Sequence, residues 1–173
     1  MLVILDKDLT LVQPLLGEGF VTHPRDQYLL PGVADRVHEL KAAKVEMVIV
    51  SNQGGCETIN PETGKPYKTI DEAIAEMRYC MELLPEIERA YFCPDMKGFE
   101  AYGVWKDFQL FTCNGEHSFR KPAPGMLLLA IEQTRDTFAT MVGDQECDRL
   151  AARAARVPFV WAEDWRKDRF LRR

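Results

Sequence analysis

The chain has 173 residues, of which 46% are hydrophobic and 28% are charged, a size and composition typical of a globular protein with one substantial core. Its formal net charge of −5 excludes nucleic-acid binding driven by the charge of the whole molecule, although a local basic patch remains compatible with it. The sequence contains no apolar run of the ~20 residues that span a bilayer, no signal-peptide pattern, and five cysteines without a C-x-x-C pair, so we expect a cytoplasmic protein.

Short apolar runs alternate along the chain with amphipathic, helical patterns. The runs at 2–5, 46–50, 90–93, 140–143 and 158–161 predict strands, mostly of the buried parallel type. Helices are predicted after Pro31-Gly32 and over 70–84, 125–133 and 149–156, with a capping-box signature at Thr69 and Glu72. This alternation predicts an α/β fold, a three-layer α/β/α sandwich around a central parallel sheet, as a single domain over 1–173.

Two predicted connections, 11–30 and 94–120, are unusually long for a compact domain. Loops of this length are usually lids or binding loops. Neither is large enough for an independently folding cap domain, so we expect a fairly open active site.

Acidic residues follow the first predicted strand directly. Asp6 and Asp8 alternate with Thr10 after the run at 2–5, at the carboxyl end of the strand, where ligands bind in open α/β sheets. Two carboxylates that converge on one small volume need a cation or a shared proton. A plain turn is the alternative interpretation of this motif alone.

Three further motifs lie where a strand passes into a loop. Ser51 and Asn52 begin the segment S-N-Q-G-G, whose hydroxyl and backbone N–H groups suit an anion. Lys121 precedes a predicted helix in R-K-P-A-P-G-M, and Asp144 and Asp148 follow the strand at 140–143. Taken singly, these residues are also typical of a turn, a solvated lysine and a helix cap. Their shared place at the carboxyl ends of parallel strands predicts a magnesium–phosphate site, with acids for the cation and Ser51 and Lys121 for the anion.

The four motifs, in this order, resemble the haloacid dehalogenase superfamily of phosphohydrolases. The matches are D-x-D-x-T at 6–10, S-N-Q-x-G at 51–55, R-K-P-x-P-G-M at 120–126 and G-D-x-x-x-D at 143–148. The second and third motifs resemble the capless subgroup, which includes histidinol phosphatases, heptose bisphosphate phosphatases and polynucleotide 3′-phosphatases. Leu9 departs from the pattern, since the family usually has glycine there.

The resemblance implies a role for each motif residue. Asp6 is expected to attack phosphorus and form an aspartyl-phosphate, and Asp8 to act as the general acid and then the general base, its protonation favoured by phosphate and Asp6. The other expected roles are Mg²⁺ binding by the Asp6 carboxylate, the Asp8 carbonyl and Asp144, phosphate binding by Ser51, Asn52 and Lys121, and support from Thr10 and from Asp148, which would orient Lys121 or a metal-bound water.

Heptose bisphosphate phosphatases also carry a zinc loop just before the R-K-P motif. In this chain Cys93, Cys113 and His117 offer three ligands for Zn²⁺, which leaves the tetrahedral pattern incomplete. Free thiols are the alternative.

Residues near the motifs suggest contacts with the rest of a substrate. His23, Arg25 and Arg120 are candidates for polar or anionic groups, and loop stabilisation is the alternative for the first two. Aromatic residues and lysines in 94–120 suit stacking on bases or sugars, or a loop that packs its own small core. The basic tail at 165–173 suits a nucleic-acid patch or a solvated terminal helix.

Three functions agree with these motifs. The first is a phosphatase of a small metabolite, such as a sugar phosphate or histidinol phosphate. The second is a 3′-phosphatase of nucleic-acid ends, and the third a non-catalytic phosphate-binding relative, which would not need Asp8. We expect no membrane association and predict no oligomeric state.

Overall fold

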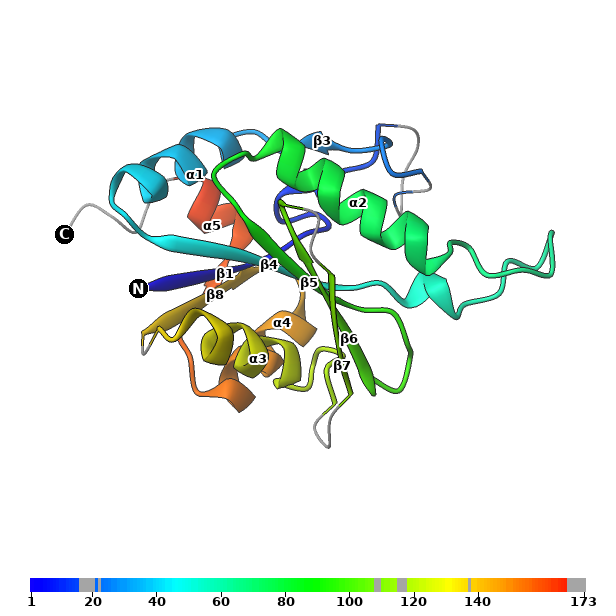
Figure 1. Ribbon diagram of the computed structural model, residues 1–173. Helices are drawn as coiled ribbons and strands as arrows, with labels where there is room; N and C mark the ends of the chain where they lie inside the picture. The colour runs from blue at the N-terminus through cyan, green and yellow to red at the C-terminus, as the bar shows by residue number, and fades with distance from the viewer. Residues whose placement is uncertain (16–20, 22, 108–109, 115–117, 137, 168–173) are drawn as a thin grey trace.

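A computed structural model of the protein describes residues 1–15, 21, 23–107, 110–114, 118–136 and 138–167. Its main sheet is formed by β1 (Leu2–Asp6), β4 (Glu46–Asn52), β5 (Arg89–Cys93), β6 (Glu100–Trp105), β7 (Leu110–Asn114), β8 (Ala139–Gly143) and β9 (Phe159–Trp161). The strand order is β7-β6-β5-β4-β1-β8-β9. Helices cover both faces of this sheet, so the predicted α/β sandwich is confirmed (Figure 1).

The two helical layers enclose separate apolar cores. The helices α1 (Val33–Ala42), α2 (Ile70–Leu83) and α5 (Ala162–Arg166) lie on one face, and α3 (Gly125–Thr134) and α4 (Glu146–Ala155) lie on the other (Figure 1). Val3 and Leu5 of β1 face the first core, and Leu2 and Ile4 face the second. Because successive side chains point to opposite faces, a strand covered on both sides must be apolar throughout, which explains the uninterrupted run at 2–5.

The topology brings the predicted motifs to one edge. β1 lies between β4 and β8 and is parallel to both, with Ile4 paired to Val48 and to Met141. The chain leaves β1 to form β4 on one side and returns later to form β8 on the other. This reversal makes a crevice at the carboxyl ends of the three strands, the usual ligand site of open α/β sheets.

The prediction of a loop over 94–120 is wrong for much of its length, because β6 and β7 extend the sheet with antiparallel strands. Three aromatic side chains of this segment form ring contacts along the sheet: Tyr102 stacks on Phe92 of β5 at 5.2 Å between ring centroids, and Trp105 meets Phe111 edge-on at 6.1 Å. Gly103 provides the space for Trp105, since a Cβ at this position would lie 2.4 Å from its ring. β6 mixes buried with half-buried residues, and no residue of β7 is buried, so both strands lack the long buried apolar run by which strands were predicted.

One other connection and the start of one helix differ in detail from the prediction. Within 11–30, β2 (Val12–Gln13) and β3 (Tyr28–Leu29) form a short antiparallel ribbon. α4 begins at Glu146 rather than at residue 149, because the Asp148 carboxylate accepts a hydrogen bond from the N–H of Gln145 and closes the first turn.

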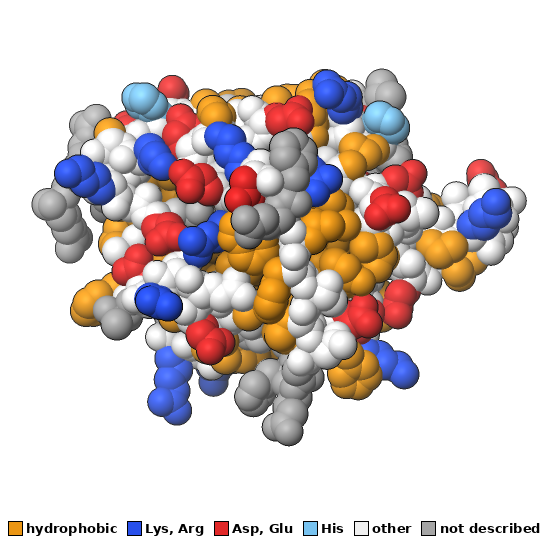
Figure 2. Space-filling view, in the orientation of Figure 1, with side chains coloured by type: hydrophobic (Ala, Val, Ile, Leu, Met, Phe, Trp, Pro, Cys, Tyr) orange, Lys and Arg blue, Asp and Glu red, His pale blue; other side chains and the backbone are white. Residues whose placement is uncertain are grey.

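An arm at residues 57–67 projects from the body of the molecule after the turn η1 (Gly54–Cys56) (Figure 1). A bridge between Ile59 and Pro66 closes it, and the side chains of Ile59 and Tyr67 are about half exposed. Figure 2 shows acidic, basic and hydrophobic side chains together on this arm. Across the described ranges, no helix is both long enough and apolar enough to cross a membrane.

The capping box predicted before α2 is present and gives a direct test of the helix start. The Thr69 hydroxyl accepts from the N–H of Glu72 at 3.2 Å, and the Glu72 carboxylate accepts from the N–H of Thr69 at 2.7 Å. Because Thr69→Ala leaves a helix N–H without its partner, we expect the free energy of unfolding in urea to fall by ~1 kcal/mol. Thr63→Ala in the exposed arm is the control, with a change below ~0.5 kcal/mol. Equal effects of the two substitutions would contradict this account.

Candidate active site

The ammonium group of Lys121 lies between two carboxylates at the carboxyl edge of the sheet. Its Nζ is 2.5 Å from Oδ1 of Asp6, at the end of β1, and 2.7 Å from Oδ1 of Asp148, in α4. It also donates to the carbonyl of Val50 at 3.2 Å. All three charged side chains are buried. Burial alone would lower the pKa of Lys121, but the two carboxylates outweigh it and raise the pKa, so the ammonium stays charged.

Asn52 fixes the main chain of Lys121. Its side-chain amide donates to the Lys121 carbonyl at 2.9 Å and accepts from the Lys121 N–H at 3.0 Å. The sequence suggested a phosphate contact for Asn52, but both ends of this amide are engaged by the backbone of Lys121. Asn52 therefore joins the end of β4 to the segment that carries the lysine.

Three carboxylates form the acidic part of the site. Asp6, Asp144 and Asp148 each offer an oxygen, and these oxygens lie within 4.8 Å of one another. The Thr10 hydroxyl donates to Asp144 at 3.3 Å. Three ionised carboxylates and the one ammonium of Lys121 leave an excess of two negative charges. A compact, net-negative set of oxygens fits a hard divalent cation such as Mg²⁺.

Burial and neighbouring charges raise the pKa values of Asp6 and Asp144. Burial, followed by the charges of Asp148 and Asp8, raises the pKa of Asp6 to about 7, although Lys121 opposes the shift. Burial and the charge of Asp148 also raise the pKa of Asp144. Both shifts show that the free cluster disfavours full ionisation, which a bound cation would relieve.

The Asp8 side chain points to a different set of partners. Its Oδ1 is 2.5 Å from Nζ of Lys7, and its Oδ2 accepts from the Gln53 amide at 3.1 Å and lies 3.5 Å from the Ser51 hydroxyl. Burial would raise the pKa of Asp8, but the ion pair with Lys7 outweighs it and lowers the pKa. In the free protein, therefore, the surroundings of Asp8 favour its ionised form, with Lys7 completely buried beside it. Its protonation beside phosphate and Asp6 stays a prediction.

The turn after β1 is held from the far end of the chain. Leu9, where glycine was expected from the resemblance, has φ 59°, a left-handed conformation that costs an L-residue ~1–2 kcal/mol. Nη1 of Arg166, in α5, donates to the carbonyls of Leu9 and Thr10 at 3.1 and 2.9 Å. Sequence reasoning missed Arg166, since no local pattern links it to the first strand.

The predicted substrate contacts separate into two groups. Arg120 borders the S-N-Q-G-G turn. Both terminal nitrogens of its guanidinium lie 3.0 Å from the position that a Cβ on Gly54 would take. Arg25 lies over the ring of Tyr79 at 5.1 Å, and its backbone N–H donates to His23 at 3.2 Å. These contacts of His23 and Arg25 agree with the alternative of loop stabilisation.

The zinc prediction gains no support from the structure. Among the described residues, the group of three potential ligands close enough to share an ion is the aspartate cluster; His117 lies outside these residues. The Cys93 thiol donates to Asp95, and burial raises its pKa to about 12. The Asp95 carboxylate accepts from the N–H groups of Gly98, Phe99 and Glu100, so it organises this turn.

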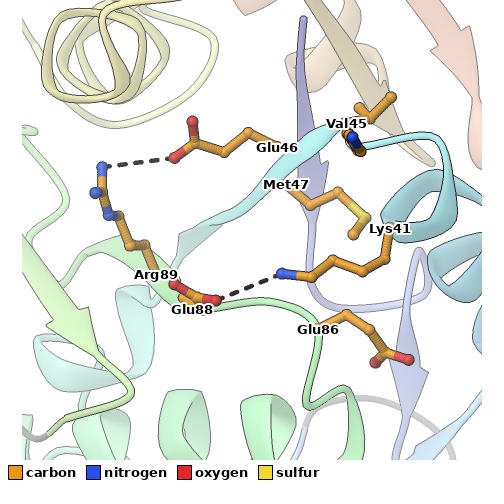
Figure 3. A pocket seen from close by; sticks show the side chains of 8 residues that line it. Lys41, Val45, Glu46, Met47, Glu86, Glu88 and Arg89 are labelled. Atoms are coloured by element: carbon orange, nitrogen blue, oxygen red, sulfur yellow. Dashed lines mark hydrogen bonds and ion pairs between the residues drawn. The ribbon is translucent and has the colours of Figure 1, made fainter.

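Two surface pockets lie at the opposite, amino edge of the sheet. They have volumes of about 370 and 440 Å³ and share Arg89. In the first, Arg89 pairs with Glu46 at 3.7 Å and Lys41 with Glu88 at 3.5 Å (Figure 3). Because these charges are already paired and lie away from the aspartate cluster, we place the functional site at the carboxyl edge.

Comparison with known proteins decides the family. The family described as "Polynucleotide kinase 3 phosphatase" matches residues 1–150. The chain belongs to this family. It is thus a phosphatase of the haloacid dehalogenase superfamily, a phosphoric monoester hydrolase, and the non-catalytic alternative is set aside.

Individual relatives agree with this assignment. The chain is 33% identical, over 160 residues, to the D-glycero-D-manno-heptose-1,7-bisphosphate 7-phosphatase of Thermosynechococcus vestitus, covering 88% of this chain and 74% of that protein. It is 31% identical over 159 residues to the D-glycero-beta-D-manno-heptose-1,7-bisphosphate 7-phosphatase of Escherichia coli K12, covering 90% and 74%. The fold resembles the crystal structure of a D,D-heptose 1,7-bisphosphate phosphatase from B. bronchiseptica with magnesium and phosphate, at TM-score 0.63 and 22% identity, covering 92% and 78%.

The raised pKa of Asp6 predicts how stability depends on pH in the metal-free protein. Folded Asp6 keeps its proton up to about pH 7, whereas unfolded aspartate loses it near its ordinary value of 3.8. The free energy of unfolding should therefore fall as pH rises between these values. Asp6→Asn removes this dependence, so we expect the free energy of unfolding of the variant, relative to the wild type, to rise by ~1–4 kcal/mol between pH 4 and pH 8.

Urea unfolding in EDTA, from pH 4 to pH 8, measures this difference. Asp35→Asn on the exposed surface of α1 is the control and should track the wild type throughout. A stability difference between Asp6→Asn and the wild type that does not grow with pH would contradict the assigned burial of the Asp6 charge.

Proposed function

We propose that this phosphatase is a Mg²⁺-dependent phosphomonoesterase that acts on a small phosphorylated metabolite, a sugar phosphate, through an aspartyl-phosphate on Asp6. The observation that carries the proposal is the meeting of Asp6, Lys121 and two further aspartates at the carboxyl edge of β1, β4 and β8. A substrate phosphate and a cluster of carboxylates are all negatively charged, so they share one site only if cations between them offset the repulsion. Lys121 is one such cation, and the cluster is suited to hold another.

The proposed reaction has two displacements at phosphorus. A carboxylate oxygen of Asp6 attacks phosphorus and the bond to the leaving oxygen breaks. Asp8, which takes up a proton from solvent when the anionic substrate binds, gives that proton to the leaving oxygen. Asp8 then takes a proton from water, whose oxygen attacks the aspartyl-phosphate, releasing phosphate and restoring the Asp6 carboxylate. Ser51 and Lys121 hold the phosphoryl oxygens during both steps.

The cation would be held by Asp6 and Asp144, with the Asp8 carbonyl as a further oxygen. When bound, Mg²⁺ supplies positive charge that offsets the carboxylates and the phosphoryl oxygens. Asp148 would act through Lys121, whose ammonium it holds in place at 2.7 Å. Thr10 would orient Asp144 through its hydroxyl.

The substrate class rests on the relatives. The heptose bisphosphate phosphatases named above match about nine-tenths of this chain and act on a phosphorylated sugar. Arg120, at the rim beside Gly54, is the described cation best placed to meet a polar or anionic group of such a substrate.

A second candidate function is a 3′-phosphatase of nucleic-acid ends. The name of the matching family favours it, and the net charge of −5 opposes it. The tail predicted as basic falls mostly outside the described residues, which end at Lys167 before 168–173.

A panel of phosphorylated metabolites, assayed for phosphate release with Mg²⁺, tests the proposal. We expect turnover of sugar phosphates and none in EDTA. Asp6→Asn should lose at least ~10⁴-fold in kcat, the order seen when a covalent nucleophile is removed, while Asp35→Asn keeps full activity. Ordinary turnover by Asp6→Asn would refute the nucleophile assignment, and inactivity on every sugar phosphate would refute the substrate class.

An oligonucleotide with a 3′-phosphate distinguishes the second candidate. If the chain acts on small metabolites, we expect kcat/KM for the oligonucleotide to be at least ~100-fold below that for the best sugar phosphate. Efficient cleavage that falls steeply as salt rises would instead indicate contacts with the nucleic-acid backbone and favour the 3′-phosphatase.

A further inference from the structure

A second group of buried charges lies beside the site, and it surrounds Asp8. Lys7 is fully buried between Oδ1 of Asp8, at 2.5 Å, and Oε2 of Glu76, at 3.7 Å. A buried ammonium is strongly unfavourable without partners. Its two carboxylates come from different elements, the loop after β1 and the helix α2.

The contacts continue from Glu76 and return to Asp8. Oε1 of Glu76 is 2.6 Å from Nζ of Lys68, which donates to the Gln53 amide oxygen at 3.0 Å. The amide nitrogen of Gln53 donates to Oδ2 of Asp8 at 3.1 Å and to the Ser51 hydroxyl at 2.8 Å. Lys7, Glu76, Lys68, Gln53 and Asp8 thus form a closed ring.

The ring balances its own charge and fixes both oxygens of Asp8. Two lysines offset the two carboxylates, so the ring has no net charge to attract a cation, unlike the aspartate cluster. Lys7 holds one Asp8 oxygen and Gln53 holds the other, while 33% of the Asp8 side-chain surface remains exposed. A carboxyl held at both oxygens keeps one orientation toward the solvent-facing part of the site.

We propose that Lys7, Gln53, Lys68 and Glu76 are positioning residues for Asp8, and that Glu76 joins the ring to α2. This inference rests on the proposed function, in which Asp8 protonates the leaving oxygen. Glu76 touches neither Asp8 nor the aspartate cluster in the contacts found among the described residues, but it is the acid shared by both lysines. Removing its charge leaves Lys68 and Lys7 competing for Asp8 and changes the direction of that carboxyl.

The dependence of rate on the leaving group reveals a misplaced acid. p-Nitrophenyl phosphate and benzyl phosphate are similar in size, but the nitrophenolate leaves without a proton whereas the benzyl alkoxide needs one. The constant kcat/KM covers the steps up to phosphoryl transfer to Asp6, so hydrolysis of the aspartyl-phosphate does not affect it. The ratio of the two kcat/KM values on one preparation is also independent of the fraction of folded protein.

We expect Glu76→Gln to lower kcat/KM for benzyl phosphate at least ~10-fold and that for p-nitrophenyl phosphate less than ~3-fold. Asp8→Asn is the benchmark, with a loss of ~10²–10⁴-fold confined to benzyl phosphate. Glu82→Gln, an exposed glutamate of the same helix, is the matched control and should leave the ratio unchanged. Lys68→Met should shift the ratio in the same direction as Glu76→Gln, and it serves if that variant does not fold.

Equal losses on both substrates in Glu76→Gln and Lys68→Met, with a selective loss in Asp8→Asn, would overturn the positioning inference alone. Equal losses in Asp8→Asn would overturn the acid assignment in the proposed function, and the inference with it. A wild type that hydrolyses neither these esters nor any sugar phosphate would overturn both.

Discussion

The position of one buried ammonium group determines the arrangement of this site. Lys121 is stable inside the protein because Asp6 and Asp148 surround it, and unpaired burial would be strongly unfavourable. This requirement ties together β1, α4 and, through the Asn52 amide, the end of β4. The fold forms the crevice, and the contacts of Lys121 determine how closely β1, β4 and α4 approach one another there.

Two neighbouring groups of charges have different roles in the proposed reaction. The group around Lys121 carries an excess of negative charge, which suits a divalent cation and, through it, a phosphate. The ring around Asp8 has no net charge and therefore does not attract a cation. Its proposed effect is to orient the Asp8 carboxyl. Asp6 and Asp8 are two residues apart in the chain, yet they face these different surroundings. Arg166 holds the turn that follows Asp8 through the carbonyls of Leu9 and Thr10.

The strand-end motifs could be predicted from the sequence because they directly follow buried apolar runs, whose parallel pairing puts them at one edge. The hairpin β6–β7 could not, since β6 is buried at only some of its positions and β7 at none. Lys7 and Glu76 were also missed, although Glu76 lies on the helical stripe of the buried Ala73 and Cys80. A charge on such a stripe indicates a buried partner but not which one, because the partner comes from a distant part of the chain. Arg166 carries no comparable signal.

The central claim is that phosphate passes through a covalent bond to Asp6. Quenching the enzyme during turnover of a sugar phosphate and reducing it with borohydride converts an aspartyl-phosphate to homoserine, which peptide mass spectrometry can locate. The account predicts homoserine at position 6, and none when substrate is omitted. Homoserine at another aspartate, or full turnover with unmodified Asp6 at every quench time, would contradict it.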